Sequence, residues 1–263
     1  MSELNKEILD QTKGVAVELY KDTVRPIVKP IGDILGFLPR SIKLALSGWE
    51  KWIINGEESL KLTAEAIKEK VKKIPEEKLV EPEPYVAIPA IQQISYCQNS
   101  EELRELYANL LTASMNSDKK WQVHPSFVDI IKQLNPDEAR YLKALPPMIL
   151  PIYPLIDVDF SYGDDKGTHP VISNFTDYKI DILEYPENIC AYIDNIIRLN
   201  LIEIPSGQVI RDKNVYAKLE KHPMIQNPVG DDDKVQIKYH YKHKLFKLTN
   251  FGVNFLEVTC KDI

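Results

Sequence analysis

Cysteine is scarce in this chain, and its three copies lie far apart. Cys97, Cys190 and Cys260 form no CxxC pair, so we expect neither a disulfide framework nor a zinc ribbon. The sequence also lacks any run of about 18 uncharged apolar residues and any basic start followed by an apolar leader. We therefore expect no membrane-spanning helix and no secretory signal, and we place the protein in the cytoplasm.

The familiar catalytic and nucleotide-binding motifs are missing as well. The sequence contains no GxxxxGK[ST] or GxGxxG phosphate loop, and it has neither a GxSxG elbow nor an HExxH pair. These gaps predict a protein that is not an enzyme, with no cofactor, no metal site and no small-molecule substrate. The formal net charge of -6 argues against general electrostatic capture of nucleic acid.

The composition is that of a folded protein. Hydrophobic residues make up 44% of the 263 residues and charged residues 27%, which suits one or two buried cores. The pattern predicts an α+β fold that is predominantly helical. We divide it into an amphipathic, proline-punctuated helical region (1–74), a linker (75–84), a second helical region (85–145) and an α+β module (146–263).

Apolar spacing and capping residues predict the helices of the first two regions. Leu60, Ala64, Ile67, Val71 and Ile74 form one amphipathic stripe, and a helix is expected over 88–97. The strongest signal covers Leu103–Ser114, where Asn99 with Glu102 predicts a capping box. Pro125 is expected to begin a helix that ends near Leu134. Asn135-Pro136-Asp137-Glu138 then predicts the cap of the next helix.

The α+β module reads as a winged helix. Ile189–Leu199 predicts a buried helix, and Leu201–Ile204 predicts a short strand. A longer strand is predicted where Val235, Ile237, Tyr239 and Tyr241 alternate with polar residues. Leu245–Leu248 is expected to continue that strand or to pair with it, and Thr249 is expected to cap a last helix. Helix, short strand, hairpin, strand and helix follow one another in the order of a winged-helix module.

Several short runs of the sequence resemble those of a known family. The run LRELYANLLTASM (103–115) is followed by HPSFVDIIKQL (124–134) and NPDEA (135–139), and the chain closes with LTNFG (248–252), Phe255 and Cys260. Over about residues 75–260 this order resembles the abortive-infection alpha family. The resemblance implies a bacterial antiviral protein of abortive-infection type, active in phage resistance. It implies no catalytic residues, which favours a non-enzymatic effector or sensor.

The segment Val24–Ile54 combines apolar bulk, tryptophan and cations. An interfacial membrane helix has this composition, whereas a helical hairpin packed on the core is the ordinary explanation of such stripes. Under the first interpretation the protein lies at the periphery of the inner membrane or binds a protein partner. The candidate contact residues are Ile34, Leu35, Phe37, Leu38, Trp49 and Trp52.

An alternative function is that of a nucleic-acid-binding regulator with a lysine-rich wing at 234–247. Its candidate contacts are Lys234, Lys238, His240, Lys242 and Lys244. The helix before the wing carries Glu187 and Asp194 with Arg198 as its one base, which suits major-groove reading poorly. A solvated edge strand protected by lysines is the simpler explanation.

Other polar residues favour structural interpretations. His124 and Ser126 would form a base and a nucleophile only with an orienting carboxylate, so we favour a helix start at Pro125. His240 and His243 should fall on opposite faces of a strand, and His169 and His222 are isolated. Asp231-Asp232-Asp233, which follows Gly230, predicts a solvated hairpin tip.

Overall fold

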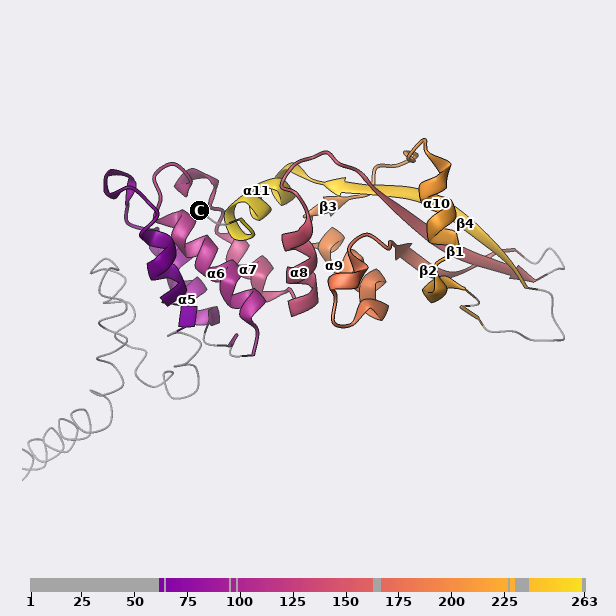
Figure 1. Ribbon diagram of the computed structural model, residues 1–263, viewed down its shortest axis with the longest axis horizontal. Helices are drawn as coiled ribbons and strands as arrows, with labels where there is room; N and C mark the ends of the chain where they lie inside the picture. The colour runs from indigo at the N-terminus through magenta and orange to yellow at the C-terminus, as the bar shows by residue number, and fades with distance from the viewer. Residues whose placement is uncertain are drawn as a thin grey trace, which may run out of the picture. The chain divides into compact units, whose positions relative to one another are not determined.

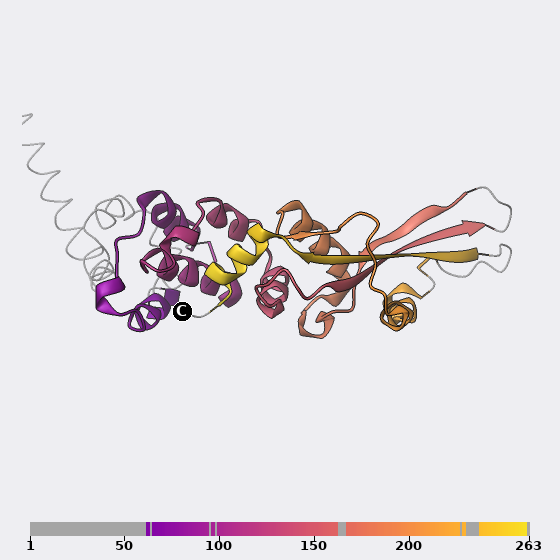
Figure 2. The same ribbon diagram turned by 90° about the horizontal axis from the view of Figure 1, so that it is seen from above.

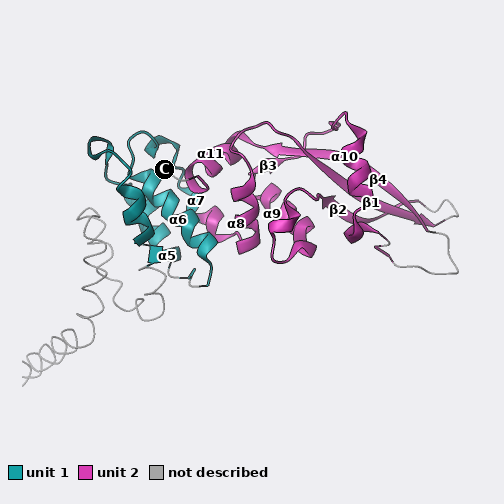
Figure 3. Ribbon diagram, viewed as in Figure 1, with its two compact units in different colours: residues 1–128, 263 teal, residues 129–262 magenta. Residues whose placement is uncertain are grey.

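The computed structural model describes residues 62–261, apart from 64, 95, 98, 163–166, 227 and 230–236. The chain divides into two compact units, with the boundary between Val128 and Asp129 (Figure 3). This boundary falls inside helix α7 (Ser126–Lys132). The described part of the first unit is helical, and the second unit mixes helices with a sheet. The expected α+β class is therefore confirmed.

Two helices that pack against each other form the centre of the first unit, α5 (Pro84–Ile94) and α6 (Glu101–Ser114) (Figure 1). Each helix buries an apolar face, with Val86, Ala90 and Ile94 on α5 and Leu106 and Leu110 on α6. Helical residues at 62–63 and 65–71 precede them. The described part of the unit also contains two 3₁₀ turns, η4 (Glu76–Lys78) and η5 (Lys120–Gln122).

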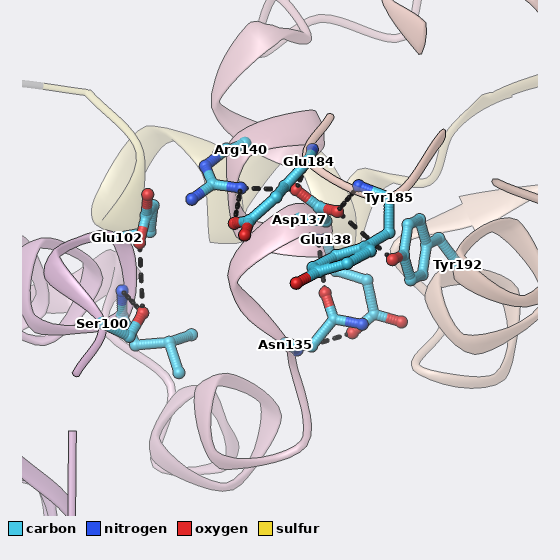
Figure 4. A network of polar contacts seen from close by, with 10 residues as sticks. Ser100, Glu102, Asn135, Asp137, Glu138, Arg140, Glu184, Tyr185 and Tyr192 are labelled. Carbon is cyan, nitrogen blue, oxygen red and sulfur yellow. Dashed lines mark hydrogen bonds and ion pairs between the residues drawn. The ribbon is translucent and has the colours of Figure 1, made fainter. Parts of the chain in front are cut away.

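The cap of α6 differs from the prediction. Ser100, not Asn99, is the N-cap, because its Oγ accepts a hydrogen bond from the backbone N–H of Leu103 at 3.2 Å. Glu102 contacts the same hydroxyl at 3.2 Å (Figure 4). A serine hydroxyl satisfies this amide as well as an asparagine side chain does, so the helix begins one residue later than expected.

The second unit contains a four-stranded antiparallel sheet with the strand order β2-β1-β4-β3. Strands β1 and β4 are the long central pair, and their register runs from Tyr153 opposite Phe246 to Tyr162 opposite Ile237. Helix α9 contacts β2, and α10 contacts β1 (Figure 2). The strands are β1 (Tyr153–Tyr162), β2 (His169–Phe175), β3 (Ile202–Glu203) and β4 (Ile237–Leu248). The helices and turns are α8 (Pro136–Ala144), η6 (Ile180–Ile182), η7 (Pro186–Asn188), α9 (Ile189–Arg198), α10 (Lys213–Glu220), η8 (Pro223–Ile225) and α11 (Asn250–Thr259).

The winged-helix interpretation is not confirmed. The predicted strands are present as β3 and, over 237–241, as part of β4. Leu245–Leu248, however, extends β4 and does not form a separate strand. The long partner of β4 is β1, and β3 pairs with β4 only at Ile202–Leu248 and Glu203–Lys247. Alternation of apolar and polar residues predicts a strand but does not predict which strand it pairs with. Here the partner, β1, lies far upstream in the chain.

The closing motif joins β3, β4 and α11 at one point. Thr249 caps α11 by accepting the backbone N–H of Gly252 at 2.8 Å, and its hydroxyl donates to the carbonyl of Asn200 at 2.7 Å. Gly252 lies so close to Leu201 that a Cβ would stand 1.9 Å from the Leu201 carbonyl oxygen. Only glycine permits this approach of helix to backbone.

Helix α8 begins with the predicted capping box. Asn135 Oδ1 accepts from the backbone N–H of Glu138 at 2.8 Å, and the Glu138 carboxylate accepts from the backbone N–H of Asn135 at 2.7 Å. The second carboxylate oxygen of Glu138 accepts from the Asn195 side chain in α9 at 2.8 Å. The cap therefore also connects α8 to α9.

The Asp137 carboxylate gathers donors from three segments (Figure 4). It is 3% exposed and accepts from the backbone N–H groups of Glu184 at 2.9 Å and Tyr185 at 2.8 Å. The Tyr192 hydroxyl and the Arg140 guanidinium donate to it at 3.2 and 2.6 Å. Burial alone would raise the pKa of Asp137, but the two backbone N–H groups, with Arg140 and Tyr192, outweigh it and hold this pKa below its usual value.

Replacing Asp137 by asparagine should lower the free energy of unfolding in urea by about 3 kcal/mol, since one acceptor oxygen becomes a donor that faces N–H groups. A carboxylate with a depressed folded pKa stabilises the fold above its unfolded pKa of about 3.9, and this stability is lost as the pH falls through the folded value. The difference between wild type and Asp137→Asn should therefore shrink below about pH 4.

Asp181→Asn is the matched control, because Asp181 is exposed on η6. It should change the free energy of unfolding by less than about 0.5 kcal/mol. An equal loss in both variants would show that Asp137 is not a special anchor of this unit.

Candidate interaction site

A groove of about 420 Å³ lies in the first unit, in the size range of ligand pockets. It is formed where the start of α5 meets the end of α6 and the η5 turn. The residues that line it combine two aromatic rings and two valines with short hydroxyl side chains and one ion pair. They are Glu83, Tyr85, Val86, Ser114, Ser117, Lys120, Trp121 and Val123.

Backbone hydrogen bonds fix the two walls of this groove against each other. Val80 N–H donates to the carbonyl of Met115 at 2.9 Å, and Ser117 N–H donates to the carbonyl of Lys78 at 2.9 Å. Leu79 and Asn116 consequently form an antiparallel bridge. Part of the segment 75–84, which was expected to be a linker, is thus paired with the chain that follows α6.

The charges around the groove are paired within the unit. Lys120 Nζ lies 2.8 Å from the Glu83 carboxylate and donates to the carbonyl of Glu81 at 3.0 Å. Lys78 lies 2.6 Å from Asp118, whose carboxylate raises the pKa of Lys78 by accepting its hydrogen bond. The groove therefore presents compensated charge to an incoming molecule.

Trp121 is the most exposed of the large hydrophobic side chains that the structure describes. It is 77% exposed, and Tyr85 across the groove is 60% exposed. The indole N–H is already used, because it donates to the carbonyl of Asp118 at 2.8 Å. The ring is therefore oriented by the protein and offers its apolar surface to solvent. Rigid, exposed tryptophan and tyrosine side chains are typical anchors of protein–protein contacts.

The candidate nucleic-acid contacts lie on β4, where most of them face acids or a hydroxyl of β1. Asp159 lies 2.5 Å from Lys242 and Asp157 lies 2.6 Å from Lys244. The His240 ring nitrogen and the Ser161 hydroxyl are 2.8 Å apart. Each of these contacts is diagonal, two positions along from the directly opposite residue.

These acidic partners limit how far the β4 lysines can serve phosphate groups. Asp159 is 3% exposed, and its hydrogen bond raises the pKa of Lys242. Lys238 is exposed and makes no ion pair within the described part of the chain. Lys234 lies outside the described residues, as does Asp231-Asp232-Asp233.

His124 and Ser126 lie close together at the start of α7. The His124 Nδ1 is 2.6 Å from the Ser126 hydroxyl, and it also accepts the backbone N–H of Ser126 at 3.2 Å. This geometry is that of a side chain which caps a turn. Both side chains lie at the surface.

The other histidines take separate positions. His243 contacts the Glu220 carboxylate at 2.6 Å and stacks on Tyr216. His222 accepts the backbone N–H of Met224 at 3.3 Å, and His169 packs near Phe160. Among the described residues, no three histidine, cysteine, aspartate or glutamate side chains are grouped so that they could hold a metal ion.

The candidate membrane contacts fall outside the described residues: Ile34, Leu35, Phe37, Leu38, Trp49 and Trp52. Within the ranges that are described, no helix is long and apolar enough to cross a membrane.

Neither Tyr85 nor Trp121 was predicted as a contact residue from the sequence. The available signal was a lone tryptophan in the polar stretch Asn116–Gln122, where a large aromatic ring has few apolar neighbours to pack against. The acidic partners Asp157 and Asp159 were missed because they lie more than 80 positions from the lysines that they contact.

Comparison with known proteins gives one family. A family model described as abortive infection alpha matches residues 55–259. No curated protein and no solved structure matches the chain.

Lys242 and Lys238 share one face of β4 but differ in their surroundings, which allows a matched test. Lys242→Met keeps the alkyl chain and leaves the buried Asp159 without its counter-charge, so it should lower the melting temperature by a few degrees. Lys238→Met should leave the melting temperature unchanged.

The same pair tests the nucleic-acid alternative. Wild type and Lys238→Glu with Lys242→Glu should bind a labelled DNA duplex equally weakly in fluorescence anisotropy. Salt-dependent binding by wild type that this double variant abolishes would contradict the structural role and favour a basic wing.

Proposed function

The chain belongs to the abortive infection alpha family, and we propose that it protects bacteria against phage as a non-enzymatic effector or sensor that works by binding. The family match covers most of the chain and supports a role of abortive-infection type. In such a role an infected cell dies or stops growing before phage are released. Cytoplasmic placement belongs to this proposal.

The binding part of the proposal is carried by the groove between Tyr85 and Trp121. Its two aromatic rings are far more exposed than core packing would leave them. The ion pairs and backbone bonds around them keep the groove formed in the absence of a partner. Preorganisation of this kind reduces the entropy cost of association.

In its sharper form, the proposal assigns the segment Val24–Ile54 to the inner membrane. Its composition supports this assignment, since Trp49 and Trp52 lie among apolar residues and cations. Infection would then be sensed by the folded units and transmitted to this segment, which docks on or damages the membrane.

A nucleic-acid-binding role is the weaker alternative. Lys242 and Lys244 each contact a carboxylate of β1, so their charge is partly compensated before any phosphate arrives. Among the described candidate lysines, Lys238 is the exposed cation without an ion pair, and a single lysine supplies little of the affinity that phosphate binding requires.

Expression in a susceptible host, followed by challenge with a diverse phage panel, tests the proposal. At low multiplicity of infection, cells that carry the gene should form fewer plaques than cells that carry an empty vector. At high multiplicity the infected cells should die or stop growing without releasing phage. Soluble, abundant protein that affects no phage in the panel would contradict a defence role.

The same infected cells test the membrane form. Wild-type protein should move to the membrane fraction during infection, and Trp49→Ser with Trp52→Ser should remain in the soluble fraction and protect less well. Protection by a protein that stays soluble throughout would remove the membrane step and leave the rest of the proposal in place.

A further inference from the structure

The second unit exposes an apolar loop between α8 and β1. Met148, Ile149 and Leu150 follow one another there, and Met148 and Leu150 are 53% and 66% exposed. No charged residue occurs between Lys143 and Asp157. Three consecutive exposed apolar residues are unfavourable in a soluble domain unless they contact something.

This loop is held firmly at both ends. Leu145 and Tyr153, which flank it, are buried at 0% and 4% exposure. Within the loop, Met148 N–H donates to the carbonyl of Pro146 at 2.8 Å. Pro146, Pro147 and Pro151 restrict the backbone further. The loop is thus a preformed apolar projection that loses little conformational entropy on binding.

The groove of the first unit has the matching chemistry. Its charges are paired, since Lys120 contacts Glu83, so it favours an uncharged occupant. The hydroxyls of Tyr85 and Ser117 make no hydrogen bond within the described part of the chain. They are therefore available for backbone carbonyls, which a proline-rich loop offers in excess over N–H groups.

We propose that the loop Pro146–Ile152 of one molecule inserts Met148 and Leu150 into the Tyr85–Trp121 groove of a second copy. This inference rests on the proposed function, because it names the partner of the same groove. The two surfaces differ, so two copies either exchange loops reciprocally in a closed two-fold dimer or repeat the contact head to tail into a ring or a filament. An open assembly then has one free groove at one end and one free loop at the other.

A single loop in a single groove is a small contact. Interfaces at the low end of the size range form weak, transient complexes, so we expect association that grows with protein concentration, with a Kd of about micromolar or weaker. An effector that assembles in this way would remain dispersed at low abundance and assemble where it accumulates.

Sedimentation velocity of the purified full chain over a concentration series tests this contact without phage. Wild type should associate as its concentration rises. Trp121→Ala and Leu150→Ser should each sediment as monomers, and Val209→Ser, which alters an exposed valine elsewhere, should behave as wild type. Circular dichroism checks that each variant is folded, and Leu150→Ser is the safer test because this side chain lies in an exposed loop.

A mixture of the two variants tests the contact between loop and groove most directly. Trp121→Ala keeps its loop and Leu150→Ser keeps its groove, so an equimolar mixture should form dimers that neither protein forms alone and should not grow further. A wild type that is monomeric at every concentration would overturn the inference, as would association that neither substitution changes. If a monomeric wild type protects against plaques, the defence role stands and the assembly is wrong. If wild type associates but does not protect, the assembly stands and the defence role is wrong.

Discussion

The buried carboxylate of Asp137 is the interaction on which the second unit depends. It receives donors from α8 itself, from the backbone at Glu184 and Tyr185, and from Tyr192 in α9. Because α9 contacts β2, the hydrogen bonds of Asp137 connect α8 to α9 and, through α9, to the edge of the sheet. Asn135 and Glu138 reinforce this connection through the cap and Asn195. The run NPDEA (135–139) therefore begins helix α8 and also connects this helix to α9 and to the backbone at Glu184 and Tyr185.

The sequence predicts correctly those features that depend on residues close together in the chain. The capping box at Asn135, the Thr249 cap and the apolar faces of α6 and α9 follow from spacing that is visible in the chain. The partner of β4 did not follow, because strand pairing with β1 depends on contacts between distant segments. For the same reason the lysines of β4 were predicted without Asp157 and Asp159. Asn99 was displaced by Ser100 because either side chain suits the same role.

These polar contacts also determine which surfaces remain available for function. On β4 the basic side chains are largely engaged by β1, and around the groove Lys78 and Lys120 each have an acidic partner. Large apolar side chains are also exposed: the rings of Tyr85 and Trp121 in one unit and Met148–Leu150 in the other. A protein with such surfaces is better suited to contacts with protein than to phosphate groups. The proposal of defence through binding joins this property to membership of the family.

The central claim is that defence requires contact through the groove, and the efficiency of plating on cells that express Trp121→Ala tests it most directly. Val209→Ser, at an exposed site away from the groove, serves as the control. If the claim is right, Trp121→Ala loses protection by at least about tenfold, as expected for truncation of a binding anchor, and Val209→Ser protects like wild type. Full protection by a Trp121→Ala protein that is folded and as abundant as wild type would contradict the claim.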